Sequence, residues 1–285
     1  MSTPVRIAGF VLGLVAVFLA ARGVGAVANP VDVATPVAHD DMGAAGHDDG
    51  GHTEQAVAHA PGGLQTSEQG YTLRVVRQQP LRFTVDGPDG HAVTAYDVVH
   101  DQPLHLVKVR RDGTGYQHVH PTMADDGTWT ARLDLEPGSN RVIADFTPTG
   151  GPELVLGADV EVSGTYAASP APAVSRTDRV GPYEVTLAGD LEAGGSSPLT
   201  ATVTRDGEPV TDLQPYLGAY GHLVALREGD LAYLHVHPEE SAAGPDIPFV
   251  AEVPSVGRYR LFLDFKLHDV VHTAAFVLEV DGHDH

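Results

Sequence analysis

A pattern of histidines occurs twice in this chain. The run HLVKVRRDGTGYQHVHP begins at His105, and the run HLVALREGDLAYLHVHP begins at His222. The two runs align without a gap, and nine of their 17 positions are identical. Imidazole is the commonest metal ligand in proteins and suits Cu(II), Zn(II) and Ni(II). The chemistry that this repeated pattern predicts first is therefore metal binding.

Each run has the pattern of a β-hairpin with its histidines at the open end. In the first run, the turn RDGTG separates a strand that starts at His105 from a return strand that ends at His120. Alternation places His118 and His120 on one face, and a four-residue turn sets His105 opposite His120 and Val107 opposite His118. Directly opposed side chains have Cβ atoms about 5 Å apart, within reach of a shared ion. The predicted ligands are His105, His118 and His120 in a first site and His222, His235 and His237 in a second.

The same strand face carries Val107, Val109 and Tyr116, which have the pattern of a hydrophobic core. The histidines are therefore expected at the rim of a sandwich, partly desolvated, with an open coordination position like that of catalytic or exchange sites. The alternative is that they are rim residues that hold no ion, because a duplication also copies neutral positions.

Further side chains near the two runs could support a metal site. Asp145 and Asp264 stand in matching Asp-Phe pairs, where each could orient an imidazole by a hydrogen bond or lie on the surface beside an arginine. Met123 after the first run suits Cu(I), whereas Glu240 after the second run suits harder ions. His272 has the strand parity of inward-facing apolar residues, so we expect it to join the second site. The accessory candidates are Asp145, Asp264, Met123 and His268, whereas His91 and His100 are interpreted as turn or surface residues.

The rest of the chain has the period-two alternation of half-buried strands. In PLRFTVDG, for example, alternate residues from Leu81 to Val85 are apolar, and Asp-Gly pairs separate such stretches. The second half repeats the first, with RVIADF matched by RLFLDF. The predicted fold class is all-β, with two tandem immunoglobulin-like antiparallel β-sandwiches at residues 69–165 and 179–281 and a proline-containing linker at 166–178.

The N-terminal segment is hydrophobic. Arg6 precedes an apolar run, and the small-residue stretch AVA ends at Ala28. Residues 1–28 are therefore predicted to be either a cleaved export signal or a membrane anchor interrupted by Arg22. Either way, the remainder is expected outside the cytoplasmic membrane, secreted or anchored to it.

A segment rich in histidine and aspartate follows at residues 29–68, where HDD occurs twice. It has few large apolar side chains to bury, so it is expected to lack fixed structure. Such tracts bind metal weakly and adaptably. The weak ligands predicted in this segment are His39, His47 and His52, and a short His-rich tail occupies 282–285.

Composition narrows the function classes. The formal net charge is −21, which repels nucleic acid and anionic headgroups and favours cations. The chain has 16 histidines and no cysteine, which excludes disulfides, thiolate metal sites and cysteine nucleophiles.

The two HVHP runs, together with RVIADF, RLFLDF and HTAAF, resemble a family of actinobacterial exported or membrane-anchored proteins described as heavy-metal-binding-domain or uncharacterised secreted proteins. The repeated module is similar to YtkA-type and other immunoglobulin-like periplasmic domains, over nearly all of residues 71–280. Cu/Zn superoxide dismutases also carry a His-x-His strand in a sandwich, but this chain has neither their bridging-histidine segment nor their cysteine pair.

Three functions remain open at this point. The first is an extracytoplasmic protein, not an enzyme, that binds, buffers or hands over copper or zinc, with a membrane metal transporter or a receiving metalloprotein as partner. The second is a metalloenzyme with an open copper or zinc position. The third is a structural or adhesive sandwich pair whose histidines are incidental.

Overall fold

The computed structural model describes residues 61–234, 236–239 and 241–281 of the chain, and these described residues belong to one compact unit. The predictions for 1–28, for most of the His/Asp-rich segment and for 282–285 lie outside the described residues. The described part of the chain contains no helix with the length and hydropathy needed to cross a bilayer.

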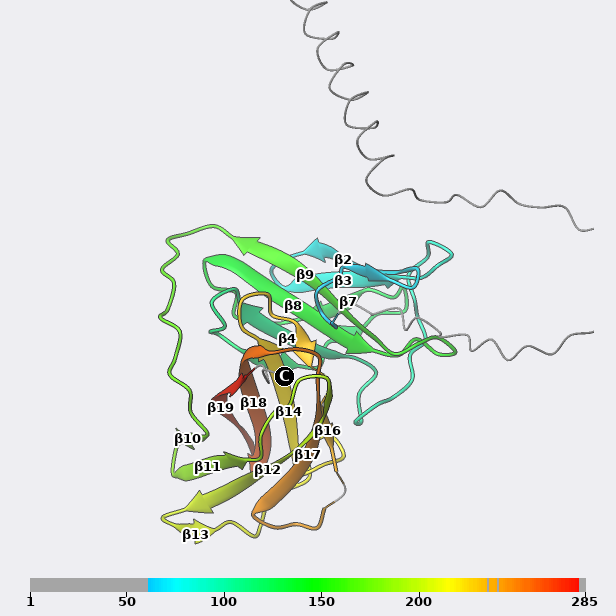
Figure 1. The fold of residues 1–285 in the computed structure, drawn as a ribbon. Helices are drawn as coiled ribbons and strands as arrows, with labels where there is room; N and C mark the ends of the chain where they lie inside the picture. Colours follow the sequence, from blue (N-terminus) through cyan, green and yellow to red (C-terminus); the bar gives the residue numbers. More distant parts are fainter. Residues whose placement is uncertain (1–60, 235, 240, 282–285) are drawn as a thin grey trace, which may run out of the picture. The chain divides into compact units, whose positions relative to one another are not determined.

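The first β-sandwich consists of two antiparallel sheets (Figure 1). The five-stranded sheet has the order β1-β2-β3-β7-β6, and the four-stranded sheet has the order β5-β4-β8-β9. The strands are β1 (Ser67–Glu68), β2 (Tyr71–Arg77), β3 (Leu81–Asp86), β4 (His105–Arg110), β5 (Gln117–Val119), β6 (Thr122–Met123), β7 (Trp129–Ala131), β8 (Gly138–Phe146) and β9 (Leu154–Val162).

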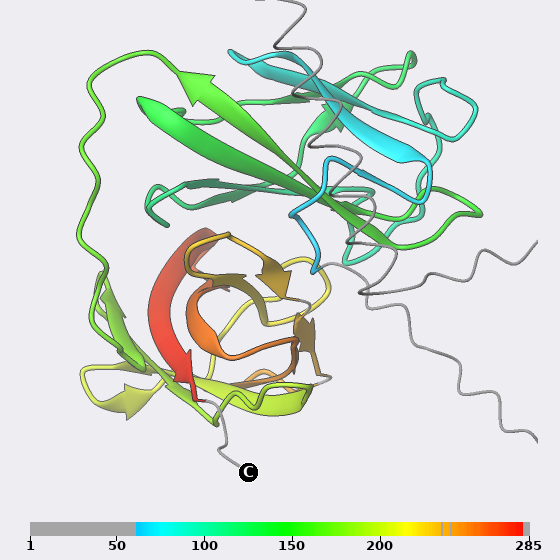
Figure 2. The same ribbon diagram turned by 45° about the horizontal axis from the view of Figure 1, so that its top comes forward.

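The second β-sandwich repeats this topology (Figure 2). One sheet has the order β10-β11-β12-β17-β16, with β13 paired to β12, and the other has the order β15-β14-β18-β19. The strands are β10 (Thr177–Val180), β11 (Tyr183–Ala188), β12 (Gly195–Arg205), β13 (Glu208–Pro209), β14 (Gly221–Arg227), β15 (Tyr233–Leu234), β16 (Val236–Pro238), β17 (Asp246–Val253), β18 (Gly257–Leu267) and β19 (Val270–Val280). The predicted all-β tandem repeat is confirmed.

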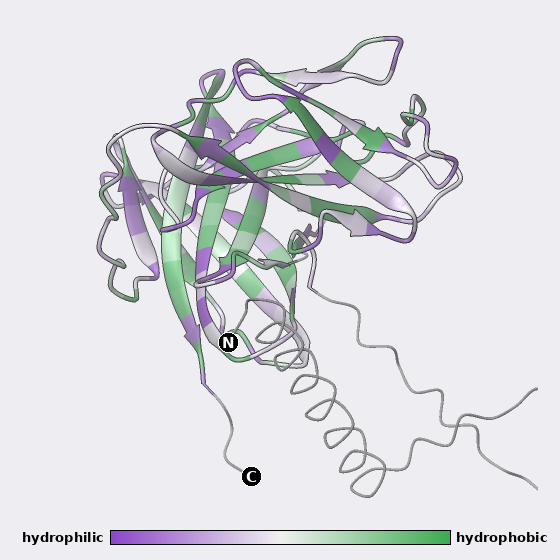
Figure 3. Cartoon of the chain, turned by 90° about the horizontal axis from the view of Figure 1, so that it is seen from above, coloured by the Kyte–Doolittle hydropathy of each residue, from purple (hydrophilic) through white to green (hydrophobic). Residues whose placement is uncertain are grey.

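Each sandwich encloses its own hydrophobic core, as the strand alternation predicts. Figure 3 shows apolar residues, in green, along many of the strands. In β3, Leu81, Phe83 and Val85 are at most 1% exposed, and the ring of Phe83 stacks on Trp129. Full burial of such a side chain contributes about 1.5–3 kcal/mol, so these alternating faces supply much of the driving force for the fold.

A third hydrophobic cluster lies between the two four-stranded sheets. It joins residues of β4 and β8 to residues of β14 and β18, and the Tyr116 ring stacks on Phe262 with centroids 4.1 Å apart. Val107 and Val109 are therefore buried, but against the second sandwich and not in the core of the first. The central strands are covered on both faces, which explains why β4 reads as a nearly continuous buried run.

Residues 61–68 belong to the folded unit, although the sequence predicts no fixed structure for them. The Gly63 amide donates to Val155 O at 2.8 Å, and the Tyr233 amide donates to Gly62 O at 2.9 Å. The guanidinium of buried Arg141 donates to Gly63 O and Leu64 O. Hydrogen bonds to its backbone hold this segment more than apolar side chains do. The amino-acid composition, which shows only a lack of large apolar residues, therefore could not predict that the segment is ordered.

Candidate metal centre

Three histidines converge at the open end of the β4–β5 hairpin. The ladder pairs Val107 with His118, which is the predicted register and leaves His105 and His120 at the same end. One ring nitrogen from each of His105, His118 and His120 lies within 4.8 Å of the other two. The ring centroids of the three pairs are 5.4, 5.0 and 5.0 Å apart. With metal–nitrogen bonds of about 2.05 Å, imidazoles on one tetrahedral ion have centroids roughly 5 Å apart, so the spacing fits a shared ion.

The hydrogen bonds of two of these rings fix which nitrogen carries the proton. His105 Nε2 lies 3.0 Å from Val99 O, and His118 Nδ1 lies 3.0 Å from a carboxylate oxygen of Asp264. Both partners only accept, so both of these nitrogens must donate. The remaining nitrogens, His105 Nδ1 and His118 Nε2, then face each other as lone pairs at 3.2 Å. Two opposed lone pairs repel, and a cation held between them relieves that repulsion.

His120 adds a third nitrogen to this position. Its Nε2 is buried and has no hydrogen-bond partner among the described residues. A buried polar atom without a partner costs about 1–3 kcal/mol, unless a bound ion or water satisfies it. The donor set is therefore three imidazoles, two of them with their lone pairs directed inward by other hydrogen bonds.

Burial lowers the pKa of three imidazoles at the site. Desolvation, with repulsion from neighbouring imidazoles, lowers the pKa of His105 to about 4 and the pKa of His120 to about 3. The same causes lower the pKa of His222 to about 4. Neutral imidazole is the form that binds metal, so these rings stay competent well below the ordinary histidine pKa of about 6.5.

A carboxylate of each sandwich accepts a hydrogen bond from a side chain of the other. We expected Asp264 to support a site within the second sandwich, and the β14–β18 ladder does set it opposite His222. Its carboxylate nevertheless accepts from His118 and from the Tyr116 hydroxyl of the first sandwich. The Tyr233 hydroxyl of the second sandwich donates to Asp145 at 3.2 Å. A carboxylate that accepts from the far nitrogen of a histidine orients the ring and raises its basicity, which is the usual arrangement behind metal-binding imidazoles.

Of the second predicted triad, the structure describes His222 and His237. His237 lies exposed on β16, which pairs with β17 in the other sheet of the second sandwich. His222 is 7% exposed, and its Nε2 lies 3.1 Å from both Tyr216 O and Leu217 O. His235 lies outside the described residues. The expectation that the two runs form equivalent sites is therefore not met by His222 and His237.

The other two histidines proposed for the second site, His272 and His268, lie away from His222. His272 faces inward as predicted, but its ring packs between Phe265 and Tyr183. Because it pairs with Phe265 and not with Asp264, it lies on the opposite sheet face from His222. His268 is exposed in the turn before β19.

Met123 and Glu240 are the remaining candidates near the two runs. Met123 packs against the core of the first sandwich, so its thioether is used in packing. Glu240 lies outside the described residues.

His100 is a residue that the sequence interpretation missed. It occupies a two-residue turn with Asp101, and both have positive φ, 48° and 60°. Its ring lies 5.1 Å from His222 and 6.1 Å from His105 between centroids. The prediction of a turn was sound, but nothing in the sequence showed that the turn faces the other sandwich.

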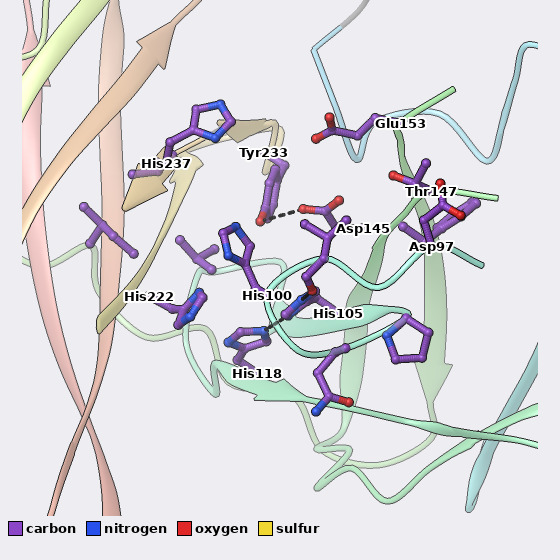
Figure 4. Close-up of a pocket in the computed structure, with 17 residues that line it drawn as sticks. Asp97, His100, His105, His118, Asp145, Thr147, Glu153, His222, Tyr233 and His237 are labelled. Carbon is purple, nitrogen blue, oxygen red and sulfur yellow. Dashed lines mark hydrogen bonds between the residues drawn. The ribbon is translucent and has the colours of Figure 1, made fainter. Parts of the chain in front are cut away.

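A cavity of about 120 Å³ lies beside the triad (Figure 4). His100, His105, His118 and His222 gather on one side, and Asp145 and Glu153 lie on the other. His237 also lines the cavity, with its ring apart from the other four. At about 30 Å³ per water, this volume holds an ion and a few waters but no large substrate.

Comparison with known proteins identifies the repeat but not its activity. The model of a family described as a domain of unknown function, DUF8832, matches residues 59–167 and 177–282. No curated protein matches the chain.

Solved structures give only distant likenesses. Domains 4 and 5 of the S-layer protein SbsC are 10% identical, with a TM-score of 0.24, over 79% of this chain and 95% of that one. A chimeric titin Z1Z2-Z1Z2 tandem is 13% identical, with a TM-score of 0.19, over 71% and 90%. Domains 5–6 of SbsC are 14% identical, with a TM-score of 0.22, over 71% and 89%. These likenesses are too distant to carry an inference about function.

Proposed function

The chain belongs to the DUF8832 family of domains of unknown function, and we propose that it is an extracytoplasmic protein that binds a copper or zinc ion and buffers it or hands it on. The observation that carries this proposal is the set of three converging ring nitrogens, the lone-pair nitrogens of His105 and His118 and the unpartnered Nε2 of His120. Hydrogen bonds to Val99 O and Asp264 take up the other nitrogens of two rings, so the lone pairs converge. Histidines that only pack in a core do not require hydrogen bonds that direct their ring nitrogens toward a common point.

The donor types select the ion. Three imidazoles without a sulfur ligand suit Cu(II) and Zn(II), and Cu(II) has the higher affinity for a given nitrogen site. Met123 is used in the core of the first sandwich, so Cu(I) gains no thioether ligand from it. Copper(II) is therefore our first choice and zinc our second.

The surroundings favour storage or transfer over catalysis. The cavity beside the histidines, about 120 Å³, is too small for most organic substrates. Placement outside the cytoplasm follows from the hydrophobic segment at 1–28, and a membrane transporter or a metalloprotein would be the partner in transfer.

The experiment is a metal titration of the full chain purified without a polyhistidine tag. His120→Gln removes one ligand, so we expect the tightest site to weaken by more than about 100-fold, beyond the 10–100-fold usual for loss of an orienting residue. His91→Gln is the matched control, because His91 is exposed in a turn outside the cluster. Equal affinities for wild type and His120→Gln, or no tight binding in wild type, would contradict the proposal.

A further inference from the structure

Both sandwiches use the same device to hold one imidazole. In the first, a two-residue turn at His100 and Asp101 presents the Val99 carbonyl to His105 Nε2 at 3.0 Å. In the second, a two-residue turn at Leu217 and Gly218, also with positive φ at both residues, presents carbonyls to His222 Nε2 at 3.1 Å.

Each turn is closed by paired backbone hydrogen bonds, Val99 with Gln102 and Tyr216 with Ala219. The left-handed conformation costs about 1–2 kcal/mol for a residue other than glycine, and His100, Asp101 and Leu217 all adopt it. Both domains therefore contain the same kind of turn in spite of its conformational cost.

The tautomer of His222 follows from these contacts. Carbonyl oxygens only accept, so Nε2 donates and the lone pair lies on Nδ1, as it does in His105. His222 is 7% exposed and lines the same cavity as His105 and His118 (Figure 4). The second sandwich thus brings a fourth imidazole, with its lone pair on Nδ1, to the three of the first.

The distances measure how near His222 comes to sharing an ion. Its ring centroid is 6.2 Å from that of His105 and 6.4 Å from that of His118. Rings on one tetrahedral ion have centroids roughly 5 Å apart, so His222 stands about 1 Å outside that spacing. A shift of about 1 Å between the facing sheets would bring it into reach.

We propose that a single ion is held between the two sandwiches, with His105, His118 and His120 from the first and His222 from the second as its four nitrogen ligands. This rests on the proposed function and deepens it, because it replaces two sites by one shared site of four imidazoles. The ligand is a borderline divalent cation, Cu(II) or Zn(II).

A shared ion couples metal binding to the contact between sandwiches. The second sandwich supplies both a ligand, His222, and the carboxylate of Asp264 that orients His118. Affinity then depends on how the sandwiches are docked, and by reciprocity the ion strengthens that docking by the same free energy. Release of the ion to a partner would be favoured by a partner that separates the two faces.

The test is pulsed EPR on full-length protein loaded with half an equivalent of Cu(II), so that the tightest site fills first. The remote nitrogens of bound imidazoles are counted in wild type, in His222→Gln and in His91→Gln as control. We expect four imidazoles in wild type and in the control, three in His222→Gln, and an affinity at least tenfold lower in His222→Gln.

The possible outcomes separate this inference from the proposed function. Three imidazoles in wild type, or an unchanged count and affinity in His222→Gln while His120→Gln is weakened, would overturn the shared site and leave the first-sandwich site standing. Absence of tight copper and zinc in wild type would overturn both. Circular dichroism of the metal-free variants checks folding, and if His222→Gln fails to fold, the wild-type count decides alone.

Discussion

The same four residues, His-Val-His-Pro, end in different sheets in the two sandwiches. In the first, β5 runs to Val119 beside β4, and the chain enters the opposite sheet only at β6. In the second, β15 ends at Leu234, and Val236 already pairs with β17 in the opposite sheet. The crossing therefore comes earlier in the second copy, and His237 leaves the face on which its counterpart His120 lies.

The strand that receives the crossing explains the difference. β17 has eight residues and offers partners to Val236, His237 and Pro238. β7 has three residues, and on the edge away from β3 it pairs with Thr122 and Met123. Backbone N–H and C=O groups in a folded protein are nearly always hydrogen-bonded. Because β17 is longer than β7, the chain of the second sandwich finds backbone partners in the opposite sheet at an earlier residue. A motif thus does not specify a site unless the neighbouring strands hold it in the same sheet.

The largest difference in metal affinity that we expect is between substitutions of two carboxylates, Asp264 of the second sandwich and Asp145 of the first. Asp264→Asn replaces the charged carboxylate that orients His118 and raises its basicity with a neutral amide, so metal affinity should fall about 10–100-fold. Asp145→Asn alters the contact with the Tyr233 hydroxyl and should change metal affinity much less. Competition titrations with a copper chelator measure both, and thermal melts of the metal-free proteins correct for lost stability. Equal losses of affinity in the two variants would show that Asp264 has no special role.

A smaller effect is expected on the free energy of unfolding of the metal-free protein as the pH falls. The unfolded chain takes up protons on its histidines below pH about 6.5, whereas burial holds the pKa of His105 and His222 at about 4 when folded. The unfolded state then binds more protons, so the free energy of unfolding should fall as the pH drops from 6.5 towards 4, by at most about 1.4 kcal/mol per pH unit for each histidine.

Denaturant unfolding at several pH values measures this slope. His222→Gln should reduce it, because one of the buried neutral rings is gone. A slope that is the same in wild type and His222→Gln would mean that this ring is not held neutral by the interface.

Much of the fold could be predicted because alternation and duplication are local signals. The register of Val107 against His118 followed from turn length, and the inward face of β3 followed from period two. Alternation could show that Val107 and Val109 are buried, but not that another sandwich covers them.

The rest of the site depends on contacts distant in sequence. The hydrogen bond from His118 to Asp264 spans 146 residues, and no local pattern reveals it. The positions of His100 and His222 beside the first triad depend in the same way on how the two sheets face each other. The parity of His272 was predicted, but its sheet face is opposite to that of His222, which only the β14–β18 and β18–β19 pairing shows.

The most direct test of the account is the number of tight metal equivalents bound by the untagged full chain. Isothermal titration with Cu(II) and with Zn(II), in wild type and in His237→Gln, gives this number. The account predicts one tight equivalent in both proteins, well separated from the weaker binding of the remaining histidines. Two equally tight equivalents in wild type that fall to one in His237→Gln would contradict it, as would the absence of any tight equivalent.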